Sequence, residues 1–449
     1  MIRQVLRITL LAGLAACGGE QPLPLSTECH AGGYRLEDGR VMGLVARDPG
    51  DIRYLFMSGD TGGILEQDDG VWRDEDGGAL LITLGDCGDD RVVFDPGDAP
   101  VVGERIAYTV TETVFDGVDG KRAGRLTLPS EGPVDAIAVA LHGSERWSGR
   151  TGGRFQSILP AFGIGVFTFD KRGTGESEGA YTQDLYLLAE DATLARKEAA
   201  RLYGATVGEV DIGYLGPSQG GWVAPLAASM DGAAFVIASF GLAISPSRED
   251  QQEVFLALRA KGYGEDVIEK AREVTDATRA VLLSDFRSGY KQLNAVRKAY
   301  KNEDWYDDIE GEYSGQLLSA PNIGLRIVGP WRTVDGTPEY EPRPVLEGLA
   351  VPQLWILAEK DRAAPTQSTL DVLLEVQETN QGLDVVVFPD TDHGMVEFIE
   401  ADDGSREYTK VTDGYYALVR DYILTREPTL GREGPTLYRG GAGPAPLND

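Results

Sequence analysis

From about residue 105 to residue 427, short apolar runs alternate with segments of helical periodicity. Residues 136–141 (AIAVAL) are continuously apolar, as expected of a strand that is buried on both faces. Strands are expected at 136–141, 166–169, 212–215, 235–241, 353–358 and 384–388, and helices at 152–163, 186–204, 220–230 and 413–426. This alternation predicts an α/β domain with a doubly wound, mostly parallel sheet.

Other parts of the chain break the alternation. Residues 244–345 lie between two expected core strands and are rich in charged, helix-forming residues, so we expect an inserted helical cap. Residues 29–104 carry short apolar runs separated by Asp/Gly clusters, which predicts a small antiparallel β domain. Residues 18–28 are expected to be a polar linker, and the Gly/Pro-rich residues 428–449 a disordered tail.

The N-terminal residues resemble the signal peptide of a bacterial lipoprotein. Arg3 and Arg7 precede an apolar run at residues 8–16 (ITLLAGLAA), which is too short to span a bilayer. The run ends in Leu-Ala-Ala-Cys, which is similar to a lipobox with Cys17 as the lipidated residue. The resemblance implies that residues 1–17 are a signal peptide. An ordinary signal peptide with an unrelated cysteine is the alternative.

These features predict a location in the bacterial cell envelope. We expect attachment by lipid at Cys17, because no other segment is long and apolar enough to cross a bilayer. Gly18 stands where an inner-membrane retention signal often has Asp, which favours the outer membrane, on its periplasmic or surface side. In this oxidising compartment Cys29 and Cys87 form an even pair, so we predict a disulfide between them. Two free, buried thiols are the alternative.

The sequence is strongly acidic, with 42 Lys and Arg against 72 Asp and Glu and a formal net charge of −30. A negative surface repels phosphate, which argues against a nucleic-acid partner. The chain has three histidines, so a His-rich metal site is not expected, and we expect neither a metal nor another cofactor.

The pattern Gly-x-Ser-x-Gly occurs twice and marks two candidate nucleophiles. Ser218 (GPSQG) follows an expected strand within three residues and precedes a small-residue helix, as a nucleophile elbow requires. Ser177 (GESEG) lies 8 residues beyond Phe169, the end of its strand, and has Glu on both sides, whose charge would oppose an oxyanion. We therefore predict Ser218 as the nucleophile and Ser177 as part of the loop structure.

A serine nucleophile needs a base and an acid that orients the base. His393, in DTDHGM after the last expected strand, is the predicted base. Asp361, at the end of QLWILAEKD, is the predicted acid. Glu359 is the first rival for the acid. Asp392 ranks lower because the side chains of neighbouring residues usually diverge.

The oxyanion requires two hydrogen-bond donors. The backbone N–H of Gln219, which follows the nucleophile, is the first predicted donor. The second is the N–H of Ser144, in the His142-Gly143-Ser144 turn after AIAVAL. We expect His142 to pack within this turn and His30 to be structural or solvated.

At this point the sequence resembles a known family. Five motifs occur in the order seen in α/β-hydrolases: LHGS (141–144), FDKRGTGESEG (169–179), GPSQGGW (216–222), LAEKD (357–361) and DHGM (392–395). Over residues 105–427 the chain is similar to the serine hydrolases that include bacterial esterases and the prolyl-oligopeptidase and aminopeptidase-like families. The resemblance implies an α/β-hydrolase fold with the same triad. The β domain is too short for the propeller of the prolyl-oligopeptidase group.

The sequence therefore predicts a serine hydrolase that cleaves carboxylic ester bonds through an acyl-enzyme. A serine peptidase or aminopeptidase that acts on short peptides or amides stays open, because ester is preferred only for want of a recognisable site for a peptide N-terminus. A non-catalytic surface binding lipoprotein on a hydrolase fold is a second alternative. A third hypothesis is that the β domain packs on the cap and gates the site.

Overall fold

The computed structural model describes residues 25–46, 51–58, 62–68, 71–74, 81–97, 99–204, 209–332, 336–401, 404–429, 434–440 and 443–446. The predicted signal peptide, Cys17 and most of the predicted linker lie outside the described residues. No helix in the described ranges is long and apolar enough to cross a membrane.

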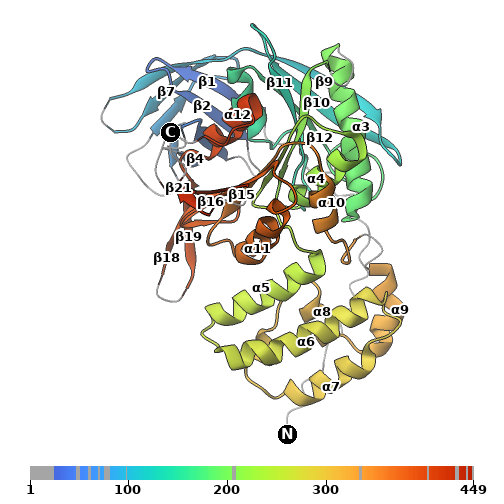
Figure 1. Ribbon diagram of the computed structural model, residues 1–449. Helices are drawn as coiled ribbons and strands as arrows, with labels where there is room; N and C mark the ends of the chain where they lie inside the picture. The colour runs from blue at the N-terminus through green and yellow to red at the C-terminus, as the bar shows by residue number, and fades with distance from the viewer. Residues whose placement is uncertain are drawn as a thin grey trace.

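A ten-stranded sheet forms the centre of the larger domain (Figure 1). Its strands are β9 (Tyr108–Asp116), β10 (Lys121–Pro129), β11 (Ala136–Ala140), β12 (Ile164–Phe169), β13 (Asp211–Pro217), β14 (Val236–Ser239), β15 (Gln353–Ala358), β16 (Leu383–Phe388), β20 (Thr436–Arg439) and β21 (Ala445–Pro446). The strand order is β21-β20-β16-β15-β14-β13-β11-β12-β10-β9. The six strands from β12 to β16 in this order pair in parallel, as the alternating sequence predicts.

Helices cover both faces of this sheet. They are α2 (Phe155–Ile158), η1 (Leu159–Phe162), α3 (Leu185–Tyr203), α4 (Gly220–Asp231), α10 (Arg343–Gly348), α11 (Thr366–Gln377) and α12 (Tyr415–Thr425). Strand β11 explains why both faces need cover. Ala136 and Ala138 pack in the core beneath α2 and α12, while Ile137 and Val139 pack in the core beneath α3 and α4.

The predicted insertion forms a helical cap with a hydrophobic core of its own. Its helices are α5 (Pro246–Ala260), α6 (Glu265–Leu283), α7 (Tyr290–Tyr300), η2 (Tyr306–Asp308), α8 (Ser314–Ser319) and α9 (Asn322–Arg332). Figure 1 shows the cap as a separate lobe below the sheet domain.

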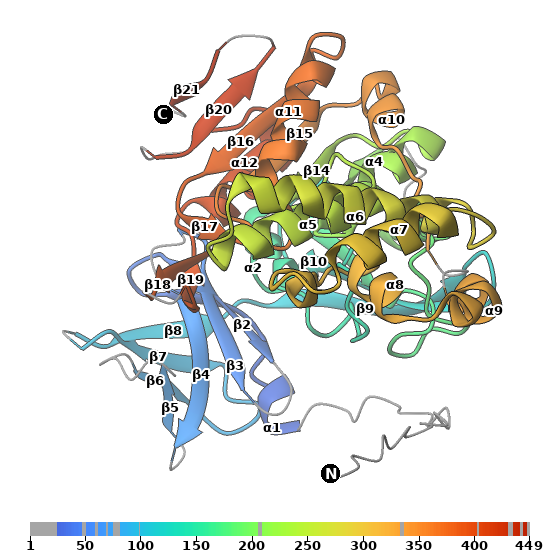
Figure 2. The ribbon, with the colours of Figure 1, turned by 90° about the horizontal axis from the view of Figure 1, so that it is seen from below.

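The N-terminal β domain is a closed antiparallel barrel, seen at the lower left of Figure 2. After the short helix α1 (Leu25–Glu28), its strands are β1 (Gly32–Leu36), β2 (Val41–Ala46), β3 (Ile52–Phe56), β4 (Gly62–Asp68), β5 (Val71–Asp74), β6 (Leu81–Leu84), β7 (Arg91–Asp95) and β8 (Val101–Arg105). Pairing of β1 with β8 closes it. Four barrel residues join the core beneath α2 and α12, and they are Val41, Val45, Leu55 and Met57. The barrel therefore packs against the sheet domain through these residues, while its interior forms a separate hydrophobic core.

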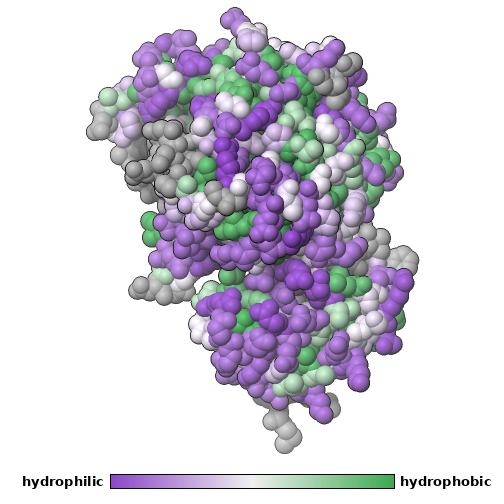
Figure 3. Space-filling model, viewed as in Figure 1, coloured by the Kyte–Doolittle hydropathy of each residue, from purple (hydrophilic) through white to green (hydrophobic). Residues whose placement is uncertain are grey.

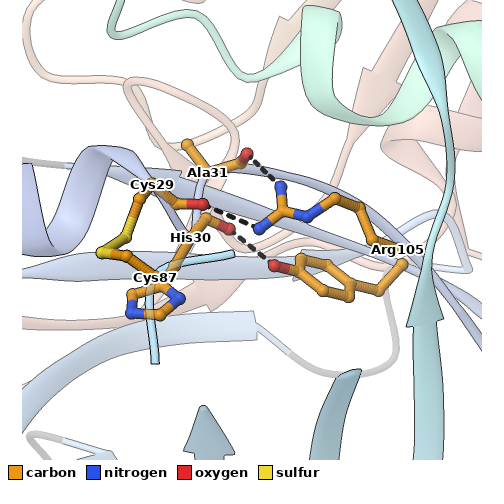
Figure 4. The surroundings of a disulfide bond; sticks show 6 residues. Cys29, His30, Ala31, Cys87 and Arg105 are labelled. Carbon is orange, nitrogen blue, oxygen red and sulfur yellow. Dashed lines mark hydrogen bonds between the residues drawn. A yellow bond between two sulfur atoms is a disulfide. The ribbon is translucent and has the colours of Figure 1, made fainter. Parts of the chain in front are cut away.

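Cys29, which lies between α1 and β1, and Cys87, which lies between β6 and β7, form a disulfide (Figure 4). Its S–S distance is 2.03 Å and its Cα–Cα distance is 5.5 Å. The Arg105 guanidinium donates to the carbonyls of Ala31 and Cys29, each at 2.8 Å. The carbonyl of His30 accepts a hydrogen bond from a tyrosine hydroxyl at 3.0 Å. The bridge closes a loop of 58 residues, which contributes about 4 kcal/mol in the chain-entropy view.

The structure differs from the sequence-based expectation after β16. The expected disordered tail instead contributes β20, which pairs antiparallel with β16, and β21. Pairing satisfies backbone groups that a free sheet edge would leave open, which local composition does not reveal. A small sheet that we did not expect flanks the DHGM motif: β17 (Thr391–Asp392) ends at its first residue, and β18 (Val396–Glu400) and β19 (Arg406–Val411) follow it. Hydrophilic side chains dominate the face in Figure 3, in keeping with the acidic composition.

Candidate active site

Ser218 lies on a sharp turn between β13 and α4. Its φ of 52° is in the left-handed region, which is uncommon for a residue with a side chain. Glycine is required beside it: a Cβ on Gly216 would lie 2.0 Å from the carbonyl oxygen of Gly220, and one on Gly221 would lie 2.7 Å from the Cα of Gly241. Gly216 in the motif and Gly221 just after it thus permit a tight turn at Ser218.

The structure brings Ser218, His393 and Asp361 together. His393 Nε2 lies 3.1 Å from Ser218 Oγ, and His393 Nδ1 lies 2.9 Å from Asp361 Oδ2. Asp361 Oδ1 also accepts hydrogen bonds from the backbone N–H groups of Ala363 and Ala364, at 2.9 and 2.7 Å. These bonds fix a carboxylate whose side chain is 1% exposed, so its orientation toward His393 is defined.

The two rival acids have other partners. Glu359 Oε2 accepts from the backbone of Asp390 at 3.3 Å. Asp392 Oδ1 accepts from the backbone N–H groups of Arg362 and His393, at 3.0 and 2.7 Å. Its other oxygen accepts from side chains of β19. Asp392 therefore holds the loop that carries His393 rather than its imidazole.

The electrostatic surroundings of His393 favour its charged form. Burial lowers the pKa of His393, but the hydrogen bond and charge of Asp361 oppose this, and the charges of Asp392 and Glu145 add to them. The pKa therefore lies above the ordinary value. From the cap, burial and neighbouring carboxylates raise the pKa of Glu253 to about 7, and Glu253 interacts with His393.

The two predicted oxyanion donors come from loops on either side of Ser218. Gln219 immediately precedes α4, so its N–H is among those at a helix start that lack an intrahelical partner. Ser144 stands between Gly143 and Glu145, which both line the cavity at Ser218. The Lys171 ammonium links the two loops, because it donates to the carbonyl of Gly143 at 2.5 Å and to Gln219 Oε1 at 3.4 Å.

Burial lowers the pKa of Lys171 to about 8. Burial also lowers the pKa of His142, which accepts at Nε2 from the backbone N–H of Lys171 at 3.4 Å and packs within the turn.

Ser177, the second candidate nucleophile, has a structural role. Its Oγ donates to the carbonyl of Asp170 at 2.5 Å and accepts from the backbone N–H of Ala123 at 3.0 Å. Its hydroxyl thus ties a loop to β10.

A cavity of about 1210 Å³ opens at Ser218 and His393. Its wall is formed mainly by the barrel strands β2 to β4, the loops of the sheet domain, the first turn of α12, and β18 with β19. Phe240 also lines the cavity, and its ring centroid lies 5.0 Å from that of the His393 ring in an edge-to-face arrangement. The barrel is therefore part of the site and not a separate appendage.

Sequence reasoning missed most polar residues of this wall, among them Arg154 and Tyr416. Arg154 precedes the short helix α2, and Tyr416 lies in the first turn of α12. Neither belongs to a motif, and the apolar spacing of α12 gives Tyr416 the pattern of an ordinary core residue. Only the packing of α12 against α2 brings them to the cavity, which a local pattern does not encode.

The structure thus places a Ser–His–Asp series of hydrogen-bond contacts beside the end of β13 in a mostly parallel, doubly wound sheet. No known protein-family profile matches the sequence, and no curated protein matches it.

Solved structures do match the chain. An acylaminoacyl peptidase from Pyrococcus horikoshii is 14% identical with a TM-score of 0.39, over 77% of this chain and 50% of that one. An esterase from Pyrococcus furiosus is 15% identical with a TM-score of 0.38, over 64% and 83% of the two chains. An esterase from Exiguobacterium antarcticum is 18% identical with a TM-score of 0.35, over 64% and 93%. This chain spans about half the length of the peptidase.

Proposed function

We propose that the protein is a serine hydrolase that cleaves carboxylic ester bonds through an acyl-enzyme. The observation that carries this proposal is the unbroken series of contacts from Ser218 Oγ through His393 to the buried Asp361. Such a series activates a serine hydroxyl, which is a weak nucleophile on its own. A cavity large enough for a small organic substrate opens at the same hydroxyl.

In the proposed reaction Ser218 Oγ attacks the ester carbonyl carbon while His393 Nε2 accepts the hydroxyl proton. Asp361 stabilises the resulting imidazolium, and the N–H groups of Gln219 and Ser144 stabilise the oxyanion. His393 then gives the proton to the departing alkoxide, and the alcohol leaves. Water, deprotonated by His393, attacks the acyl-enzyme carbonyl. The acyl–Oγ bond then breaks, His393 returns the proton to Ser218 Oγ, and the carboxylic acid is released. The step consumes one water for each ester and needs no cofactor.

We further propose that the mature chain is attached by lipid at Cys17 to the outer membrane of a bacterial envelope. The support is the lipobox-like sequence at residues 14–17 and the presence of a disulfide between the remaining two cysteines. A peptidase or amidase reaction would use the same triad. Screening of ester and amide substrates therefore has to distinguish it from ester cleavage.

The test is labelling of the chain without residues 1–17 by a fluorophosphonate, which reacts only with an activated serine. We expect labelling of the wild type and of Ser177→Ala, and its loss in Ser218→Ala, with circular dichroism to establish that each variant is folded. Hydrolysis of short acyl esters above aminoacyl amides would then support the esterase. A folded wild type that does not label would overturn the proposal and favour the binding-protein alternative.

A further inference from the structure

The cavity wall contains several cations, and most of them are paired. Arg125 Nε lies 2.6 Å from a Glu112 carboxylate oxygen, and Arg150 Nη1 lies 3.0 Å from the other. Lys410 pairs with a carboxylate three residues along the chain. Arg154 differs, because its guanidinium has no ion pair with any residue that the structure describes, and its side-chain contact with Tyr416 is its one hydrogen-bonding contact among them.

Arg154 lies close to the reacting atoms. A Cβ on Gly394, the residue after the catalytic base, would be 3.9 Å from Arg154 Nη2. Arg154 and Ser218 line the same cavity. A substrate group held by Arg154 is therefore connected to the scissile carbonyl by a short chain.

Beside Arg154 lies a second polar group, the Tyr416 hydroxyl. Tyr416 is 1% exposed, and its hydroxyl is buried without a hydrogen-bond partner in the described ranges. Tyr416 acts on Arg154 by charge and by a side-chain contact of hydrogen-bond type, although its hydroxyl has no partner in good hydrogen-bond geometry among the described residues. The neighbouring Tyr415 is satisfied, since its hydroxyl lies 2.8 Å from Ser239 Oγ. A buried polar group without a partner is unfavourable unless a ligand or water completes it.

We propose that Arg154 and Tyr416 form a subsite for a carboxylate carried on the acyl part of the substrate. The guanidinium fork matches a carboxylate in a bidentate arrangement, and the tyrosine hydroxyl donates a further hydrogen bond to it. Glu145 faces the same cavity and acts on Arg154, but lies outside ion-pair distance, so the guanidinium stays available. This inference rests on the proposed function and names its substrate class, half-esters of short dicarboxylic acids.

The test compares two esters with acyl chains of equal length, the para-nitrophenyl half-ester of glutarate and para-nitrophenyl valerate. The measured quantity is the ratio of kcat/KM for the anionic ester to that for the neutral ester, so a general loss of activity cancels. We expect wild type to prefer the anionic ester by roughly 10- to 100-fold. Arg154→Met should bring the ratio to about 1, with Arg154→Lys in between, and Tyr416→Phe should lower it by roughly 3- to 10-fold.

Two matched controls lie on α12 outside the cavity wall, Arg420→Met and Tyr422→Phe, and both should keep the wild-type ratio. A wild-type ratio of 1 or less, or a ratio that Arg154→Met leaves unchanged, overturns the subsite. Calorimetric binding of glutarate to wild type and Arg154→Met gives a readout independent of turnover. Glutarate binding that needs Arg154, in a protein that hydrolyses neither ester, would support the subsite while the proposed esterase fails.

Discussion

At the scale of single residues, the environment of His393 makes a prediction about pH. A protonated imidazole does not accept the Ser218 proton, so kcat/KM falls as pH drops through the pKa of His393. Because Asp361 and the nearby carboxylates raise that pKa above the ordinary 6.5, half-maximal activity should occur above pH 6.5. The measurement is kcat/KM for a neutral ester across pH 5 to 9. A midpoint below pH 6.5 would contradict this picture of the site.

Two variants separate the groups that titrate near His393. Asp361→Asn removes the main stabiliser of the imidazolium, so the midpoint should move to lower pH and activity should fall by about 10⁴, the loss known for the equivalent change in a serine protease. Glu253→Gln, in the cap, removes a carboxyl whose own pKa is raised to about 7. It should move the midpoint down without a comparable loss of activity at pH 8.

A buried carboxylate makes a prediction about stability. Asp191 on α3 accepts from Arg122 Nε at 3.0 Å and from Arg172 Nε at 3.1 Å, and its side chain is fully buried. Asp191→Ala would leave two buried guanidinium groups without their carboxylate, and should lower the free energy of unfolding by about 3–5 kcal/mol. Urea denaturation measures this. The exposed pair of Arg259 and Glu265 is the control, and Glu265→Gln should leave the midpoint unchanged.

At the scale of elements, the barrel strand β4 makes a prediction about substrate size. Ile64 lines the cavity at Ser218. Ile64→Trp should narrow that wall, and therefore raise KM for long-chain acyl esters several-fold relative to acetyl esters while fluorophosphonate labelling persists. Leu81→Trp, also a half-buried barrel position but outside the cavity wall, is the matched control. Equal effects of the two substitutions on KM would mean that the barrel acts only through stability.

Ile64→Trp is a clearer test of whether the barrel contributes to the site than a deletion of the whole barrel, residues 29–100. Val45 and Leu55 pack in the same core as Phe155 and Tyr416. Removal of the barrel would expose this apolar surface, so altered kinetics would report damage to the core as well as an altered wall.

The sequence predicted those elements whose pattern is local. Strand β11 is a continuous apolar run, and the turn at Ser218 needs glycines that stand next to it in the chain. Closure of the barrel depends on pairing of β1 with β8, whose residues Tyr34 and Arg105 are far apart in sequence. The register of β20 on β16 and the meeting of Arg154 with Tyr416 are equally non-local, and no period in the sequence carries that information.

At the scale of the whole molecule, the proposed lipid anchor predicts where the protein is found. Full-length protein produced in a bacterium should incorporate labelled palmitate and sediment with membranes, whereas Cys17→Ala should do neither. The double variant Cys29→Ser/Cys87→Ser retains Cys17 and should still be labelled. Palmitate incorporation by Cys17→Ala, or its absence from wild type, would contradict the anchor.

The join between the barrel and the sheet domain limits how the molecule moves. Only Ile106 and Ala107 separate β8 from β9, and the backbone N–H of Ile106 donates to the carbonyl of Gly33 at 2.8 Å. The Tyr108 hydroxyl donates to the carbonyl of Ser157 at 3.0 Å. A hinge needs residues free to change their backbone angles, and this join is bonded on both sides. The barrel is therefore held in a fixed position on the sheet domain. Any movement that opens the cavity to substrate must come from the parts of the molecule that face the barrel.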